Sequence, residues 1–385
     1  MIYFDNAATS FPKPKEVIDA VSECMTSYAA NPGRSGHKMS LMMDRKIFEA
    51  REEITDFIGG DDPLKLIFTS NATEALNIAI RGSVHEESHV VTTSLEHNSV
   101  LRPLTHLKND KNIKLDIVYG DKNSYLSANK IMEKVTKDTR AVVVTHISNL
   151  TGSVVDIEEL GQRIKDLNPN ILFIVDASQS IGLFDVDVKS MNIDLLCFPG
   201  HKSLLGPMGT GACYINTDIE LDCYREGGTG SFSKQLTQPN VYPDKFEAGT
   251  LNGPGIVGLM EGVRYIKKVG RENIKKHELS LRKRFIEGIK DLDFVTVYGP
   301  IDEHYSNVLA MNINGVDSSL VSYRLSEEFD IATRPGIHCA PLCHETINTS
   351  DIGLVRFSFG YSNTEEEVDK AISAIKAIGE SECKD

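Results

Sequence analysis

Short apolar runs alternate with segments of helical spacing along the first part of the chain. The runs are rich in β-branched and aromatic residues, which is typical of buried strands. Between them, apolar residues recur three and four positions apart, which is typical of helices that cover a sheet. The alternation predicts an α/β fold with a mostly parallel sheet and right-handed crossovers. The predicted strands are Lys65–Ser70, His89–Thr93, Lys114–Tyr119, Ala141–Ile147, Ile171–Val175 and Asp194–Phe198, and the helices predicted between them include Glu74–Arg81, Ala128–Val135 and Ile157–Leu167.

The pattern changes after the segment Asn252-Gly253-Pro254-Gly255. A long helical stretch, Ile256–Ile289, is rich in Lys, Arg and Glu and leads into a new series of strands and helices. We therefore place a domain boundary near residues 255–270.

The end of the chain carries a helix signal. A helix is predicted over Thr364–Ile378, because Thr364 and Glu367 form the S/T-x-x-E pattern of a capping box. The last six residues, 380–385, are expected to be a mobile tail.

Composition and charge narrow the class of protein. The chain has 385 residues, 41% hydrophobic and 25% charged, which fits a folded protein of two domains or one large unit. Its formal charge of −14 disfavours binding to nucleic acids and to acidic membranes. The N-terminus lacks a signal-peptide pattern, and no apolar run approaches the roughly 18 residues of a membrane span. We expect a cytoplasmic protein without a disulfide framework, since its seven cysteines are scattered.

Polar residues follow three of the predicted strands, where ligands bind in open parallel sheets. The first group, Ser70–Glu74, precedes a helix and offers backbone N–H groups and a hydroxyl to an anion. An ordinary helix cap is the alternative interpretation.

The second and third groups each present one ionisable side chain. Asp176 ends an apolar strand and would need a cationic or hydrogen-bonding partner, such as a protonated ring nitrogen, although a turn Asp is the commoner case. Lys202 lies among glycines and apolar residues, where desolvation could make its amine a nucleophile able to form a Schiff base. Surface lysines in such loops are also common, and the spacing excludes a Walker A loop.

The order of these three groups resembles that of the pyridoxal-phosphate enzymes of fold type I. Four further segments resemble the class V aminotransferase family, and within it the cysteine desulfurases and selenocysteine lyases. The resemblance implies a large domain, 15–260, with a mostly parallel seven-stranded sheet, and a smaller α/β domain formed by 1–14 and 261–385. The four segments are Phe4–Thr9, Leu95–Asn98, His146–Asn149 and Phe246–Thr250.

The resemblance also implies roles around the cofactor ring of pyridoxal 5'-phosphate. Lys202 would bind the cofactor covalently, and Asp176 would pair with the pyridinium nitrogen and keep the ring an electron sink. His97 would stack on the ring and act in catalysis by moving protons. Asn149 and Gln179 would bind the cofactor on the side of its phenolic oxygen, and Asn149 would also contact the substrate.

A second group of residues would hold the cofactor phosphate. The resemblance implies that Ala72, Thr73 and His201 bind it, joined by Thr250 from the neighbouring subunit of a homodimer. Relatives often carry a small hydroxyl residue where this chain has Pro199, so one phosphate hydrogen bond is expected to be lost or replaced.

The segment Arg334–Ala340 resembles the R-x-G-x-H-C-A signature of desulfurases with a short catalytic loop. Cys339 would then attack the substrate sulfur, whereas a buried, inert cysteine is the alternative. Ile337 replaces the usual second histidine, which changes the surroundings of the thiolate. Arg356 matches the family arginine that binds the substrate carboxylate through two hydrogen bonds, with a surface ion pair as the alternative.

The resemblance implies a cysteine desulfurase that converts L-cysteine to L-alanine and passes a Cys339 persulfide to an acceptor protein. Selenocysteine lyase is the nearest alternative, and transamination, epimerisation and kynurenine hydrolysis are more distant ones. No metal is expected, although a zinc-binding or sulfur-carrier module is an alternative from another class. It would use the cluster His338, Cys339, Cys343 and His344, whereas no role is assigned to Cys343 or Cys383 in a desulfurase.

Overall fold

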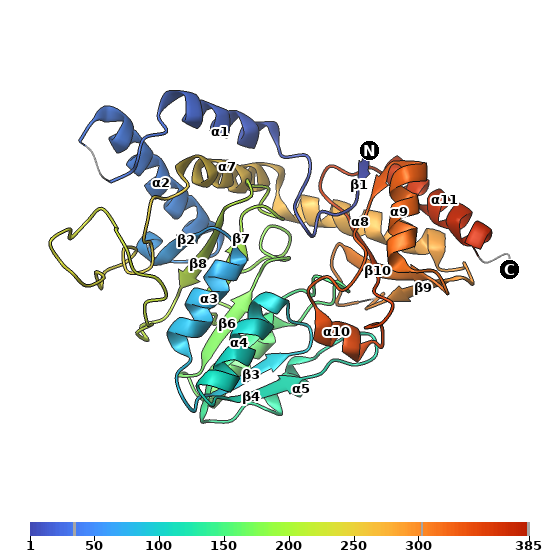
Figure 1. Ribbon diagram of the computed structural model, residues 1–385, viewed down its shortest axis with the longest axis horizontal. Helices are drawn as coiled ribbons and strands as arrows, with labels where there is room; N and C mark the ends of the chain where they lie inside the picture. Colours follow the sequence, from blue (N-terminus) through green and yellow to red (C-terminus); the bar gives the residue numbers. More distant parts are fainter. Residues whose placement is uncertain (34–35, 302, 383–385) are drawn as a thin grey trace.

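A seven-stranded sheet lies at the centre of the larger part of the computed structural model, which describes residues 1–33, 36–301 and 303–382 (Figure 1). Its strand order is β2-β8-β7-β6-β5-β3-β4. Only β8 runs opposite to the other six strands, so the predicted mostly parallel sheet is confirmed. The strands are β2 (Leu66–Thr69), β3 (His89–Thr93), β4 (Lys114–Val118), β5 (Thr139–Thr145), β6 (Leu172–Asp176), β7 (Leu195–Pro199) and β8 (Gly211–Ile215).

Alternate residues of the central strands enter two separate hydrophobic cores. Val91 and Val142 belong to one core, whereas Val90 and Val143 belong to the other. Because successive side chains of a strand point to opposite faces, both faces of the sheet are buried. The core that contains Val90 is covered by α3 (Ala72–Ser83) and α4 (Asn98–Asp110). The core that contains Val91, on the other face, is covered by α2 (Lys38–Phe57), α5 (Ala128–Met132), α6 (Ile157–Leu167) and α7 (Gly253–Val269).

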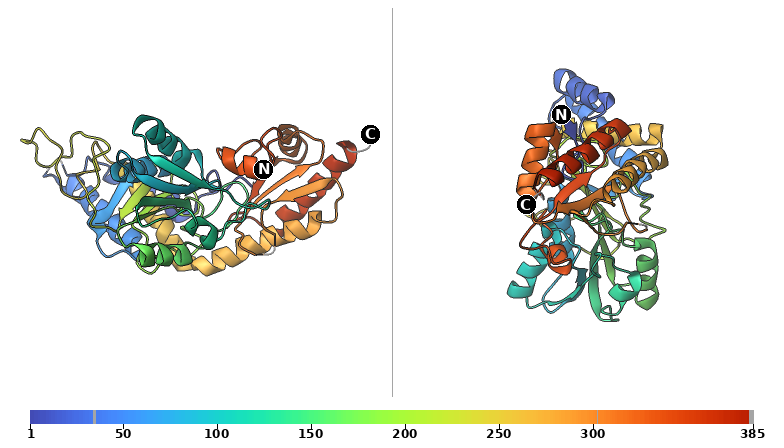
Figure 2. Two further views of the ribbon diagram at one scale, coloured as in Figure 1. Left: turned by 90° about the horizontal axis from the view of Figure 1, so that it is seen from below. Right: turned by 90° about the vertical axis from the view of Figure 1, so that its right-hand side faces the viewer.

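The C-terminal part of the chain forms a smaller unit beside this sheet. It contains a three-stranded antiparallel sheet of order β12-β10-β9, with its own core between helices α8, α9 and α11. The views in Figure 2 show that α8 runs from the larger unit along the smaller one. The elements are α8 (Arg271–Ile289), β9 (Val295–Tyr298), β10 (Val308–Ile313), α9 (Ser318–Phe329), β11 (Ile331–Ala332), α10 (Pro341–Thr346), β12 (Val355–Ser358) and α11 (Glu365–Glu382).

The N-terminus belongs spatially to this smaller unit. Strand β1 (Ile2–Tyr3) pairs in parallel with β11, and the buried Phe4 packs against Phe357 and Phe359. Helix α1 (Lys15–Ser27) then returns to pack against α7 of the larger unit.

Two details of the predicted helices are wrong. The stretch Ile256–Ile289 is two helices, because Gly270 has φ +91°, outside the helical region, and separates α7 from α8. Helix α11 continues to Glu382, so residues 380–382 are helical rather than a tail, and Cys383 lies outside the described residues. The capping box is confirmed: Glu367 N donates to Thr364 Oγ1 (3.2 Å), and Thr364 N donates to Glu367 (3.1 Å).

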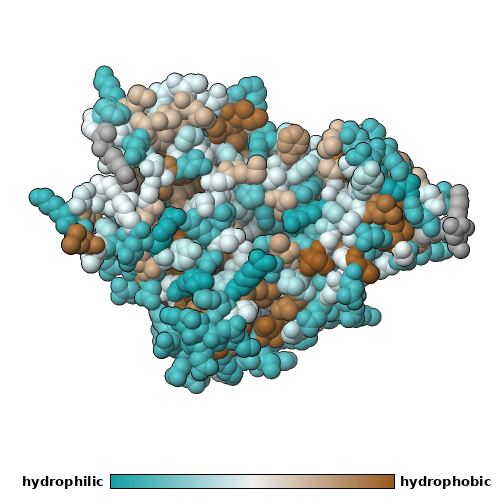
Figure 3. Space-filling view, in the orientation of Figure 1, coloured by the Kyte–Doolittle hydropathy of each residue, from teal (hydrophilic) through white to brown (hydrophobic). Residues whose placement is uncertain are grey.

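The surface is a mixture of hydrophilic and hydrophobic residues. In Figure 3, hydrophilic residues gather over the region of α4 and β4, while hydrophobic residues occur in smaller groups. Among the described helices, none is long and apolar enough to cross a membrane. The six described cysteines are free thiols.

Candidate active site

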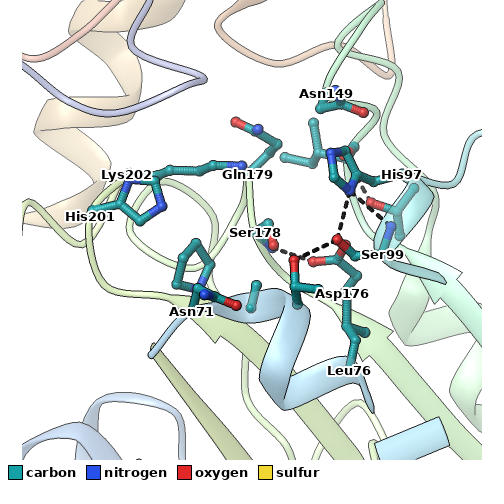
Figure 4. A pocket seen from close by; sticks show the side chains of 15 residues that line it. Asn71, Leu76, His97, Ser99, Asn149, Asp176, Ser178, Gln179, His201 and Lys202 are labelled. Atoms are coloured by element: carbon teal, nitrogen blue, oxygen red, sulfur yellow. Dashed lines mark hydrogen bonds between the residues drawn. The ribbon is translucent and has the colours of Figure 1, made fainter. Parts of the chain in front are cut away.

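A cavity of about 180 Å³ opens at the carboxyl ends of the parallel strands, where the sequence predicted a ligand site (Figure 4). Its walls come from the start of α3, the segment between β3 and α4, the segment after β5, and the ends of β6 and β7. Seven sequence-predicted cofactor residues line it together: Ala72, Thr73, His97, Asn149, Asp176, Gln179 and His201, with Lys202 as the eighth.

Lys202 extends into this cavity from the wall opposite His97 (Figure 4). Burial lowers the pKa of its amine to about 8, and the charges of Arg356 and Arg334 act in the same direction, while Asp176 opposes them. A lysine with such a pKa is neutral in roughly a fifth of molecules near pH 7.4, against about one in a thousand for an ordinary lysine, so it can act as a nucleophile or a base.

Asp176 ends strand β6 and is 3% exposed. One of its carboxylate oxygens accepts a hydrogen bond from Ser178 N at 2.9 Å. In the described part of the chain it forms no ion pair, although a buried carboxylate is costly without a cationic partner. The cavity can supply that partner in the form of a ligand cation.

His97 is the N-cap of α4, and its ring faces the cavity. Its Nδ1 accepts a hydrogen bond from Ser99 N at 3.0 Å, so the neutral ring carries its proton on Nε2. Burial, followed by the charge of Lys202, lowers the pKa of His97 to about 4. His97 is therefore neutral at physiological pH and can present an N–H donor.

The start of α3 and His201 form an anion cradle at one end of the cavity. Asn71 caps the helix by accepting a hydrogen bond from Glu74 N (2.9 Å), so both the cap and the ligand interpretation of this segment fit. The backbone N–H groups of Ala72 and Thr73 occupy the first turn, where helices leave their donors unpaired. His201 Nδ1 is buried and has no hydrogen-bond partner within the described ranges.

Asn149 and Gln179 line the cavity but already donate hydrogen bonds to backbone carbonyls. Asn149 Nδ2 donates to His338 O at 2.7 Å, and Gln179 Nε2 donates to Ala7 O at 3.0 Å. The cavity is thereby tied to the N-terminal segment and to the segment that carries Cys339.

Cys339 lies at the edge of the cavity rather than in its lining. Its carbonyl accepts a hydrogen bond from Asn98 N at 2.8 Å, next to His97, and its side chain is partly exposed. The preceding residue, His338, is held by Asn149. Both contacts join the backbone around the thiol to residues that line or border the cavity.

Arg356 is 1% exposed and has partners in its own chain. Its guanidinium donates to Asp5 at 2.6 Å and to Asn149 O at 3.0 Å, while its Nε has no partner among the described residues. The alternative of a surface ion pair is therefore wrong, because the Arg356 side chain that pairs with Asp5 is almost fully buried.

Two residues near the cavity were missed by the sequence analysis. Arg334 forms no ion pair with any described residue, yet its charge lowers the pKa of both Lys202 and His97. Glu96 is fully buried beside the cavity, where it accepts from Thr93 Oγ1 (2.6 Å) and Thr145 N (3.0 Å). Burial raises the pKa of Glu96 to about 8. Both residues belong to segments that the sequence analysis had singled out, Arg334–Ala340 and Leu95–Asn98. Their closeness to the cavity is visible only in the folded structure.

Two other predicted features lie outside the cavity. Thr250 is exposed and lines separate hollows near Leu251, not the cavity of Lys202. No group of three or more potential metal ligands comes together in the described ranges, which include His338, Cys339, Cys343 and His344. The zinc-binding alternative is therefore not supported.

Comparisons with known proteins agree with this geometry. The family described as Aminotransferase class-V matches residues 2–371. A probable cysteine desulfurase of Pyrococcus abyssi is 36% identical, with 98% of this chain and 94% of the relative covered. Another, of Methanothermobacter thermautotrophicus, is 36% identical, with 95% and 92% covered. The apo structure of a cysteine desulfurase from Thermococcus onnurineus matches with a TM-score of 0.91 and 35% identity, covering 99% of this chain and 95% of that chain.

Proposed function

Since the chain belongs to the class-V aminotransferase family, we propose that it is a pyridoxal-phosphate-dependent cysteine desulfurase, which converts L-cysteine to L-alanine. The released sulfur would remain on Cys339 as a persulfide until an acceptor protein takes it. The observation that carries this proposal is the attachment of the Cys339 backbone to the edge of the Lys202 cavity through Asn98 N (2.8 Å).

The residues of the cavity fit pyridoxal phosphate. His201 Nδ1, which has no hydrogen-bond partner among the described residues, suits a phosphate group, as does the first turn of α3 at Ala72 and Thr73. Asp176 suits a protonated ring nitrogen, and Lys202 suits the aldehyde carbon. When bound, this cofactor withdraws electrons from the α-carbon of an amino acid.

Lys202, His97 and Cys339 would carry out the proton and sulfur transfers. The neutral Lys202 amine would take the proton from the substrate α-carbon. His97 would hold a proton on Nε2, as its bond from Ser99 N requires. The Cys339 thiolate would attack the substrate sulfur. A sulfur–sulfur bond then forms, the carbon–sulfur bond breaks, and its electron pair stays with the carbon fragment that becomes alanine.

We propose that the substrate carboxylate binds beside Arg356, with Asn149 as a second contact. Arg356 Nε is buried and unpartnered in the described part of the structure, which supports this assignment. Arg334 adds a second positive charge near the cavity. Two cations are suited to binding the carboxylate of an amino acid.

The test measures alanine formation from L-cysteine by the wild type, Cys339→Ala and Cys223→Ala. Cys223 is a matched control because it is also partly exposed, but its thiol contacts Arg225 O and Lys245 O, away from the cavity. We expect Cys339→Ala to fall to the background rate and Cys223→Ala to keep the wild-type rate. Full activity of Cys339→Ala would refute the persulfide mechanism, and L-selenocysteine assayed in parallel distinguishes a selenocysteine lyase.

We further propose that two copies form a homodimer in which Thr250 of each chain completes the phosphate site of the other. The exposure of Thr250, outside the cavity of its own chain, supports this arrangement. In this proposal the large domain is 15–260 and the small domain is 1–14 with 261–385. Sedimentation equilibrium should give twice the chain mass of 42.5 kDa, and a monomer mass would exclude the shared site.

A further inference from the structure

The segment that ends in Cys339 has an unusual backbone. Gly336 has φ +99°, and the next two positive values belong to His338 (+54°) and Cys339 (+56°). Residues with a Cβ rarely adopt this left-handed conformation, and two in succession are rarer still. Such a conformation persists only where surrounding contacts hold it. The contacts of His338 and Cys339 therefore determine where the thiol lies.

His338 is held on its backbone and on its ring. Its carbonyl accepts from Asn149 Nδ2 at 2.7 Å, and its Nε2 lies 2.9 Å from Arg334 O, to which it donates. The ring is 3% exposed, and Nδ1 has no hydrogen-bond partner in the described ranges. Hydrogen bonds therefore fix only one edge of the ring, and the ring faces must be held by packing.

His344, on α10, provides that packing. Its ring is stacked on His338, with the centroids 6.1 Å apart and the planes at 9°. It is fully buried, and its Nδ1 lies 2.7 Å from Thr349 Oγ1. Thr349 is fixed in turn, since its N–H donates to His344 O at 2.9 Å. Burial lowers the pKa of both histidines, so both rings are neutral and do not repel each other.

We propose that His344 is a positioning residue for Cys339: its ring, fixed by Thr349, braces His338 and so holds the thiol at the edge of the Lys202 cavity. This inference rests on the proposed desulfurase function. His344 is not among the residues that line the cavity, and its ring lies against His338, so we assign it a role that acts through His338.

The test separates chemistry that needs Cys339 from chemistry that needs only the cavity. Alanine formation from L-cysteine requires the thiol. β-Chloro-L-alanine instead loses chloride, which leaves with its electron pair without a thiol, and water then gives pyruvate and ammonia. A third measurement is the rate at which iodoacetamide alkylates Cys339, followed by mass spectrometry. All assays use the cofactor-loaded full chain.

The variants are His344→Asn, which keeps a polar group for Thr349 but removes the stacked ring, and Thr349→Val, which removes the hydroxyl. His89→Asn is the matched control. Like His344, His89 is buried, and both of its ring nitrogens have hydrogen-bond partners. It begins strand β3, at the end of the sheet remote from the cavity.

We expect His344→Asn to lower kcat for alanine formation by on the order of 10- to 100-fold, the effect of a thiol misplaced by about 1 Å. Pyruvate formation from β-chloro-L-alanine should stay within about twofold of the wild type. Thr349→Val should show a smaller loss of alanine formation without a loss of pyruvate formation. If His344→Asn does not fold, Thr349→Val alone tests the proposal. His89→Asn should show no selective loss.

Equal losses in both reactions would mean general damage and would overturn the proposal, as would unchanged rates in both. If the wild type forms pyruvate but no alanine, the desulfurase function itself fails. In that case the rate of Cys339 alkylation tests the positioning role by itself. A rate altered in His344→Asn supports the role, and an unaltered rate overturns it.

Discussion

At the scale of single residues, the environment of Lys202 predicts a pH dependence. Burial lowers the pKa of its amine to about 8, and an amine attacks an aldehyde only when neutral. The rate at which the cofactor-free protein reacts with pyridoxal phosphate should therefore rise with pH up to about 8 and then level off. Stopped-flow absorbance measures this rate.

Lys202→Ala is the control for that experiment and should show no such adduct. A rate that keeps rising to pH 10 would contradict the lowered pKa, because an ordinary lysine gains neutral amine up to about 10.4.

Local sequence was sufficient to predict some site residues and not others. Asp176 and Lys202 follow predicted strands, and the carboxyl ends of parallel strands share one edge, so their meeting was predictable. The partner of Arg356 was not, because Asp5 lies 351 positions away and nothing in either segment specifies the pairing. The stack of His338 on His344 likewise depends on the path of the chain between them.

At the scale of elements, the break between α7 and α8 predicts the effect of a substitution. Gly270 has φ +91°, which alanine adopts only with strain. Gly270→Ala should lower the free energy of unfolding by about 1–2 kcal/mol. Urea denaturation measures this value.

Lys268→Ala serves as the comparison for Gly270→Ala. Lys268 is exposed on α7 and forms an ion pair with the exposed Glu16, so its removal should change stability by less than about 0.5 kcal/mol. Equal effects of the two substitutions would show that the backbone at Gly270 is not strained by alanine.

The strands were predicted more accurately than the helix ends. Strand β3 was predicted to the residue, and β6 to within one residue at each end, because their apolar runs are continuous and buried. Strand β8 was missed, since it follows directly on the glycine-rich segment after Lys202 and returns antiparallel, without a crossover helix to mark it. Long-range pairing, not local composition, makes it a strand.

At the scale of the whole molecule, buried acids couple stability to pH. Glu278, on α8, is 6% exposed and accepts from Asn307 Nδ2 at 2.7 Å. Burial raises its pKa from 4.5 to about 8. Between these values the folded protein binds a proton that the unfolded chain has lost, so stability falls as pH rises. The loss is at most about 1.4 kcal/mol per pH unit.

Glu278→Gln should therefore flatten the dependence of the free energy of unfolding on pH between about 5 and 8, measured by denaturation at several pH values. Glu287→Gln is the control on the same helix, because Glu287 is exposed and its hydrogen bond with Lys290 lowers its pKa instead. If both variants keep the wild-type slope, Glu278 is ionised in the folded protein.

The pairing of β1 with β11 also has a consequence for biosynthesis. Ile2 pairs with Ile331, so the first strand emerges from the ribosome long before its partner exists. At about 5–20 residues per second, that interval is roughly 15–65 s. Throughout it, Lys202 can already have folded with its sheet, while the carboxylate of Asp5 has no Arg356 with which to pair. The segment of Cys339 is thus joined to the Lys202 cavity only at the end of translation, when the beginning of the chain also docks.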